Sequence, residues 1–150
     1  MNSLLRKSSL ASLVILANIV FNPTTYAADT KPKFDCTLTD ELTADKKPGD
    51  AKDTFSKTTP LIYLICESDE VEKGQSIKAE WIAADTNNIA PANYKIDEKS
   101  LDVKKELDDD QVFTANFSLS IPNKGWPVGS YRVDLYVDNK LSQSVKFTVK

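Results

Sequence analysis

The chain has 150 residues, with 19 basic and 22 acidic side chains, two cysteines and no histidine. The lack of histidine removes the commonest general base and the usual zinc ligand, which excludes histidine triads and histidine metal sites. The acidic excess argues against nucleic acid as a partner, because phosphate binding requires clustered Lys and Arg.

The first 27 residues predict a cleavable export signal. Arg6 and Lys7 precede an apolar run over residues 10–21, and small residues lead up to Ala27, where we expect cleavage. The alternative is a membrane anchor, but a span needs about 20 apolar residues, and Asn18 and Asn22 interrupt this run. No cysteine lies at the cleavage point to carry a lipid. We therefore expect a periplasmic or extracellular chain without a membrane anchor, keeping 17 basic and 22 acidic residues once Arg6 and Lys7 are removed.

The exported part divides into two segments by composition. Residues 28–59 are rich in Lys, Asp and Thr, which predicts a polar leader with one edge strand at 34–38 and a mobile loop over 40–57. Residues 60–150 alternate apolar and polar side chains and carry enough apolar residues for one core. We expect a single domain over 60–150.

The pattern in this domain predicts only strands. The first, at 61–66, is a dense apolar run that is typical of a central strand covered on both faces. Further strands are expected at 77–83, 94–96, 101–103, 113–121, 131–137 and 141–149, and the last two are joined by a turn at 138–139. Trp81 lies on the apolar face of its strand and is expected in the core. No segment of helical length has apolar residues at three-and-four spacing. The fold class is therefore predicted as all-β, an antiparallel β-sandwich of seven to eight strands.

Cys36 and Cys66 are expected to form one disulfide, because an even pair in a small exported domain is typical of a bridge. The bridge would fasten the leader to the sandwich. The alternatives are a reactive thiol, which would lack a histidine partner, and a metal pair, which would lack further soft ligands.

Residues 125–131, Gly-Trp-Pro-Val-Gly-Ser-Tyr, resemble the G-x-Y strand entry of immunoglobulin-like and fibronectin type III-like domains. The resemblance implies an immunoglobulin-like sandwich in which Tyr131 buries its ring and forms a hydrogen bond to the backbone. Trp81, one strand after Cys66, is similar to the immunoglobulin pattern, but Cys36 lies upstream, so the disulfide between sheets does not carry over. The Pro-x-Gly-x-Tyr entry also resembles that of a small bacterial proteinase-inhibitor family, which implies a second candidate activity.

Acidic residues offer the candidates for chemistry. Residues 108–110 are three aspartates and residues 85–88 are Asp-Thr-Asn-Asn, a composition that suits Ca²⁺, but neither has the spacing of a shaped calcium loop. Solvated turns are the favoured reading. Carboxylates are abundant, yet nothing marks two of them as a glycosidase pair. We predict no catalytic residue, no metal and no cofactor.

Trp126 is the first candidate binding residue, because a tryptophan between Gly125 and Pro127 lies on a loop where rings are often exposed. The alternative is that its ring folds over the end of the sandwich. Tyr136 and Arg132 are the other candidates, because they share the solvent face of one strand.

The preferred function is a non-enzymatic exported module, a monomer that binds a protein or envelope component through Trp126 or the loop at 40–57. A structural subunit of a pilus-like assembly is the alternative, although the chain supplies its own final strand. A carbohydrate-active enzyme is a third class and needs a carboxylate of raised pKa in a cleft.

Overall fold

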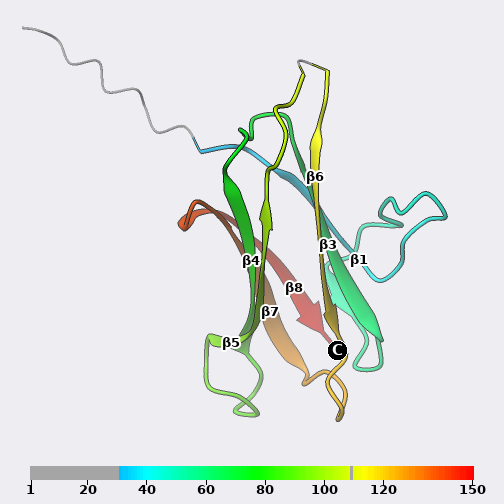
Figure 1. Ribbon diagram of the computed structural model, residues 1–150. Helices are drawn as coiled ribbons and strands as arrows, with labels where there is room; N and C mark the ends of the chain where they lie inside the picture. The colour runs from blue at the N-terminus through cyan, green and yellow to red at the C-terminus, as the bar shows by residue number, and fades with distance from the viewer. Residues whose placement is uncertain (1–30, 109) are drawn as a thin grey trace, which may run out of the picture.

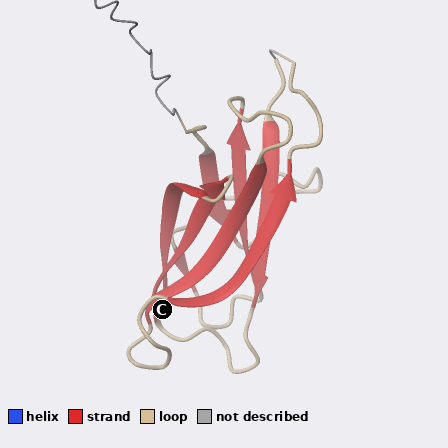
Figure 2. Ribbon diagram, turned by 60° about the vertical axis from the view of Figure 1, so that its left-hand side comes forward, coloured by secondary structure: helices blue, strands red, loops and turns tan. Residues whose placement is uncertain are grey.

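A computed structural model describes residues 31–108 and 110–150, so the predicted export signal lies outside the described residues. Figures 1 and 2 show strands joined by loops, and no helix occurs in the described part. It follows that this part contains no helix long and apolar enough to cross a membrane. The eight strands are β1 (Asp35–Thr39), β2 (Thr54–Phe55), β3 (Leu61–Ser68), β4 (Ser76–Asp85), β5 (Tyr94–Asp102), β6 (Phe113–Ser120), β7 (Gly129–Val137) and β8 (Lys140–Val149).

The strands form two sheets that pack face to face, with the order β1-β3-β6 in one and β2-β8-β7-β4-β5 in the other. All pairs are antiparallel except β2 with β8, which is parallel. In this order β3 and β6 occupy the places of immunoglobulin strands B and E, and β4, β7 and β8 those of C, F and G. The chain has an immunoglobulin-like β-sandwich fold, as predicted.

β5 differs from the prediction, which had two short strands at 94–96 and 101–103. It is one strand that pairs with β4 along its length, and the polar residues between Ile96 and Leu101 belong to it. The register shifts by one residue between Trp81 and Ile82, as at a β-bulge. Since β5 is an edge strand, polar side chains on both of its faces reach water, and the alternation is lost from its sequence.

The leader contributes a strand to each sheet. β1 lies at the edge of the three-stranded sheet beside β3. β2, which the alternation did not predict, pairs two residues with the end of β8. Between them the chain forms a small hairpin in which Leu42 bridges Pro48 and the Thr43 amide donates to the Lys47 carbonyl.

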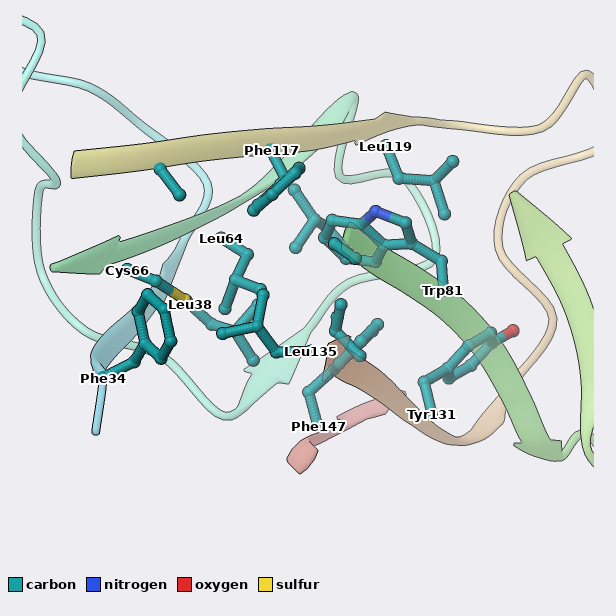
Figure 3. Close-up of a cluster of buried hydrophobic side chains, with 14 of the residues drawn as sticks. Phe34, Leu38, Leu64, Cys66, Trp81, Phe117, Leu119, Tyr131, Leu135 and Phe147 are labelled. Atoms are coloured by element: carbon teal, nitrogen blue, oxygen red, sulfur yellow. The ribbon is translucent and has the colours of Figure 1, made fainter. Parts of the chain in front are cut away.

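The core lies between the sheets and is dominated by aromatic and branched side chains (Figure 3). Trp81 is 1% exposed and sits edge-on to Phe147 at 6.2 Å between ring centroids, as its predicted inward face requires. Tyr131 stacks on Phe147 at 5.2 Å, and Phe55 from β2 meets Phe147 edge-on. The aromatic cluster therefore runs from the middle of the core to the end of the sandwich where β7 begins.

Cys36 and Cys66 form the predicted disulfide. The two residues are direct partners in the pairing of β1 with β3, with 4.1 Å between their Cα atoms. The bond therefore joins neighbouring strands of one sheet and not the two sheets, and it fastens β1 to the central strand β3.

Candidate binding groove

Tyr131 is positioned by the loop that precedes it. Its hydroxyl donates a hydrogen bond of 2.6 Å to the Pro127 carbonyl, four residues back, and its ring is buried against Phe147. Burial raises the pKa of Tyr131 to about 12, because the phenolate would lose its hydration. This is the tyrosine corner that the resemblance to immunoglobulin-like domains implied, and it fixes the start of β7.

Gly129 explains why the strand entry contains a glycine. A Cβ atom at this position would lie 2.1 Å from the Asp85 carbonyl oxygen and 2.8 Å from the Thr86 Cα. β7 passes this closely because the register of β4 with β7 shifts between Ala83 and Asp85. The β6–β7 loop (residues 121–128) and the β4–β5 turn (residues 86–93) lie at the same end of the sandwich (Figure 1), and a hydrogen bond from Asn87 to Val128 joins them.

Trp126 is buried, with 2% of its surface exposed. Its indole Nε1 donates to the Thr59 carbonyl at 2.7 Å, and its backbone amide donates to the Lys57 carbonyl at 3.0 Å. The ring meets Tyr131 edge-on at 6.1 Å. Of the two readings left open by the sequence, the ring covers the end of the core and is not displayed on the loop. The turn at Gly125, with φ of 80°, directs it inward.

The β4–β5 turn is held by its own polar side chains. Thr86 is buried, and its hydroxyl oxygen accepts the Ala90 amide at 3.0 Å. Asn87 adopts a positive φ, which asparagine tolerates, and its side-chain amide donates to the Val128 carbonyl at 3.2 Å. This bond connects the β4–β5 turn to the β6–β7 loop. The turn displays Ile89, 72% exposed, at its tip.

Between these two segments lies a groove, here called the end groove. It consists of two adjoining hollows that share Ile89, Lys124 and Trp126 in their walls. The first, of about 340 Å³, adds Tyr94 and Ile96 and has an apolar lining; the second, of about 470 Å³, adds Lys57, Asn87 and Val128. Trp126 and Tyr131 both line the first hollow, so the aromatic cluster continues into the groove.

Exposed apolar side chains gather around the end groove. Five large apolar residues are exposed in the described part of the chain, and three of them, Ile89, Tyr94 and Val128, line the groove. Covering apolar surface that is exposed to water is favourable, by about 25 cal/mol for each Å² of apolar surface that a partner buries. Because hydrogen bonds already hold both walls, the groove can take an apolar group with little ordering of the protein.

Sequence reasoning did not find this groove. Its walls come from residues near 57, 89 and 126, which are brought together only by the fold. The available signal was Ile89, an apolar residue inside a turn that is otherwise rich in Asn, Ala and Pro.

Arg132 and Tyr136 do not line the end groove; they lie on the outer face of the five-stranded sheet. The Arg132 guanidinium donates to both oxygens of Asp134, at 3.0 and 2.9 Å, and to the Asn93 side chain. Tyr136 lies under the Lys78 ammonium, 4.6 Å from the ring centroid, and partial burial raises its pKa. The fold therefore separates these two candidates from Trp126, and whether they bind a partner stays a prediction.

The acidic segments lie at opposite ends of the sandwich, residues 85–88 at the β4–β5 end and residues 108 and 110 in the β5–β6 loop (Figure 1). Asp109 lies outside the described residues. Among the described residues, no three Asp, Glu, Cys or His side chains are grouped so as to hold a metal ion.

No protein-family model and no curated protein matches the chain. Solved structures with a similar arrangement include an immunoglobulin-like protein from Pseudomonas aeruginosa, at 10% identity and TM-score 0.47, covering 82% of this chain and 99% of that one. Another is the alkylpurine DNA glycosylase AlkC from Pseudomonas fluorescens bound to DNA containing an abasic site analogue, at 12% identity and TM-score 0.47, covering 79% of this chain and 30% of that one. A β-glucosidase from Listeria innocua matches at 8% identity and TM-score 0.44 over 79% of this chain and 16% of that one.

The chain thus spans less than a third of the glycosylase and about a sixth of the glucosidase. At these identities the similarities concern the fold alone. The function of this chain has to be argued from its own surface.

Proposed function

We propose that this chain is an exported, non-enzymatic binding module that captures a protein or envelope component in the end groove. The observation that carries the proposal is the gathering of Ile89, Tyr94 and Val128 along the two adjoining hollows of the end groove. Export is supported by the signal pattern of residues 1–27 and by the Cys36–Cys66 disulfide, which an oxidising compartment maintains.

The position of the groove suits a binding role. It lies at the end of the sandwich formed by the β4–β5 and β6–β7 connections, which is opposite to the end that carries the antigen-binding loops of antibody domains. Loops on a rigid sandwich are common binding surfaces, because their side chains vary without disturbing the core.

The pilus-like alternative gains no support, since β8 already pairs with β7 along its length.

Capture from envelope extract tests the proposal. Ile89→Ser and Tyr94→Ser change exposed side chains of the groove, so we expect them to lose the captured partner while unfolding like the wild type. Tyr136→Ala on the outer sheet face is the control and should retain it. Loss of the partner in Tyr136→Ala alone would move the site to that face and refute the groove. Trp126→Ala is unsuitable here, because Trp126 belongs to the core.

A further inference from the structure

The charges around the end groove have one sign. Lys57 and Lys124 line the second hollow, Lys124 also lines the first, and among residues 31–108 and 110–150 no Asp or Glu lines either one. This contrasts with the whole chain, in which acidic residues outnumber basic ones. The groove is therefore a basic and apolar surface on an acidic protein.

Neither lysine is neutralised by the described part of the chain. Lys52, Lys78 and Lys95 each form an ion pair with a carboxylate. Lys57 and Lys124 form no ion pair with any described carboxylate, and both side chains are exposed. Their ammonium groups are available to a charge brought by a partner.

The backbone keeps these two residues on the same wall. The Trp126 amide donates to the Lys57 carbonyl at 3.0 Å, and the Gly125 amide donates to the Pro122 carbonyl at 2.8 Å across the turn that contains Lys124. The backbone of Lys57 thus lies beside that of Trp126. Lys124 is only two residues before Trp126 in the same turn. The hydrogen bond from the Trp126 indole to Thr59 holds the same two segments together from the core side.

The first hollow sets the size of the apolar group. Its volume of about 340 Å³ is at the small end of the range for small-molecule sites, roughly 300 to 1,000 Å³. Its inner wall is aromatic, since Trp126 and Tyr131 line it. One bulky side chain suits this space. Because the second hollow adjoins it along Ile89, an occupant that fills both presents two neighbouring groups, as successive side chains of a peptide do.

We propose that the occupant is an acidic segment of a partner protein, which inserts an aromatic side chain over Trp126 and Ile96 and places a carboxylate beside Lys124 and Lys57. The inference rests on the proposed function and names its ligand class. The apolar insertion supplies affinity, and the two lysines select carboxylate-bearing segments over neutral ones.

The inference is tested with three synthetic peptides. Each is titrated into the chain purified after export, and binding is followed by chemical-shift changes at the groove. The first peptide has tryptophan flanked by glutamates, the second has glutamines in place of the glutamates, and the third has glutamates flanking alanine. At low salt we expect the first to bind about tenfold more tightly than the second, a preference that falls as salt screens the charges. The third should bind weakest of all, because it lacks the aromatic group.

The double variant Lys57→Gln/Lys124→Gln should abolish the preference for the acidic peptide and leave the affinity for the neutral one unchanged. Lys104→Gln/Lys105→Gln is the control, since it removes the same charge from exposed lysines at the other end of the sandwich. An equal loss of preference in both double variants would show general electrostatic attraction and overturn the inference.

Three further outcomes separate this inference from the proposed function. Equal binding of the acidic and neutral tryptophan peptides, both lost in Ile89→Ser, would overturn the acidic preference and leave the groove as a binding site. No chemical-shift change at the groove with any of the three peptides would overturn the inference, while capture from envelope extract would still decide the proposed function. A response to the tryptophan peptides that survives in Ile89→Ser would place their site outside the groove and likewise overturn the inference.

Discussion

The indole of Trp126 donates a hydrogen bond of 2.7 Å to the carbonyl of Thr59, a residue 67 positions earlier in the chain. The bond ties the β6–β7 loop to the segment between β2 and β3, and it satisfies the polar end of a large buried side chain. One residue therefore closes the end of the core and forms the inner wall of the end groove. Because its ring is almost fully buried, variants at Trp126 report chiefly on the stability of the fold.

Removing the Trp126 ring should destabilise the fold. Trp126→Ala leaves a cavity against Tyr131, and we expect the free energy of unfolding to fall by about 3 to 5 kcal/mol. Trp126→Phe keeps most of the ring but leaves the Thr59 carbonyl without its donor, at a cost of about 1 to 3 kcal/mol. Urea denaturation measures both. Ile89→Ala, at an exposed position, should stay within about 0.5 kcal/mol of the wild type. A Trp126→Ala chain as stable as Ile89→Ala would contradict the buried position of the ring.

Gly129→Ala should be among the most damaging changes of a single small side chain. The added methyl group would lie 2.1 Å from the Asp85 carbonyl oxygen, so β7 or the bulge in β4 must move, and we expect a loss of about 3 kcal/mol or more. Gly74→Ala is the control. Gly74 has φ of 92° but nothing within 4 Å of an added Cβ. Backbone strain alone should therefore lower the free energy of unfolding of its variant, by only about 1 to 2 kcal/mol. Thermal denaturation compares the two, and equal losses would mean that the contact at Gly129 is not decisive.

The sequence predicted the strands wherever one face packs on the core and the other meets water. β6 shows this: Ala115 and Phe117 are buried, and Thr114 and Asn116 are exposed. The alternation fails where burial does not alternate. β5 is polar at an edge, and β2 is two residues long and depends on Thr148, which lies 94 residues further along the chain.

The groove was beyond the sequence for a related reason. Local composition placed Trp126 on a loop but did not decide whether its ring faces water, because the acceptor at Thr59 and the neighbouring ring of Tyr131 are supplied by the fold. The same holds for Lys57 and Ile89, which become neighbours of one groove although they are far apart in the chain. Contacts between distant segments have no signature in a single sequence.

Tyr131 should make the fold sensitive to alkaline pH. Its pKa is about 12 in the folded chain and about 10 when unfolded, so the unfolded chain releases its proton first. The stability that Tyr131 contributes is complete below pH 10 and is lost as the pH rises from about 10 to about 12. Tyr131→Phe lacks this titration. It should be less stable at pH 8, because the hydrogen bond to Pro127 is gone, by about 1 kcal/mol.

Urea unfolding of the wild type and Tyr131→Phe between pH 8 and pH 11.5 checks this. Titration of the lysines and of the other tyrosines affects both chains alike, so the difference between the two isolates Tyr131. We expect that difference to shrink or reverse as the pH rises. A constant difference up to pH 11.5 would mean that the hydroxyl of Tyr131 ionises as readily in the folded chain as in the unfolded one.

The disulfide should stabilise the fold chiefly through β1. Cys36 and Cys66 are 30 residues apart, and closing a loop of that length is worth about 3 to 4 kcal/mol in the chain-entropy model. β1 pairs with β3 alone in the described part of the chain, so the double variant Cys36→Ala/Cys66→Ala should loosen β1 before the central strands. Hydrogen exchange should speed up in β1 much more than in β4 or β7, while urea denaturation reports the global loss. The wild type reduced with dithiothreitol should behave in the same way. Uniform acceleration across all strands would show that β1 unfolds only together with the whole sandwich, and an unchanged urea midpoint would show that the pairing of β1 with β3 needs no covalent support.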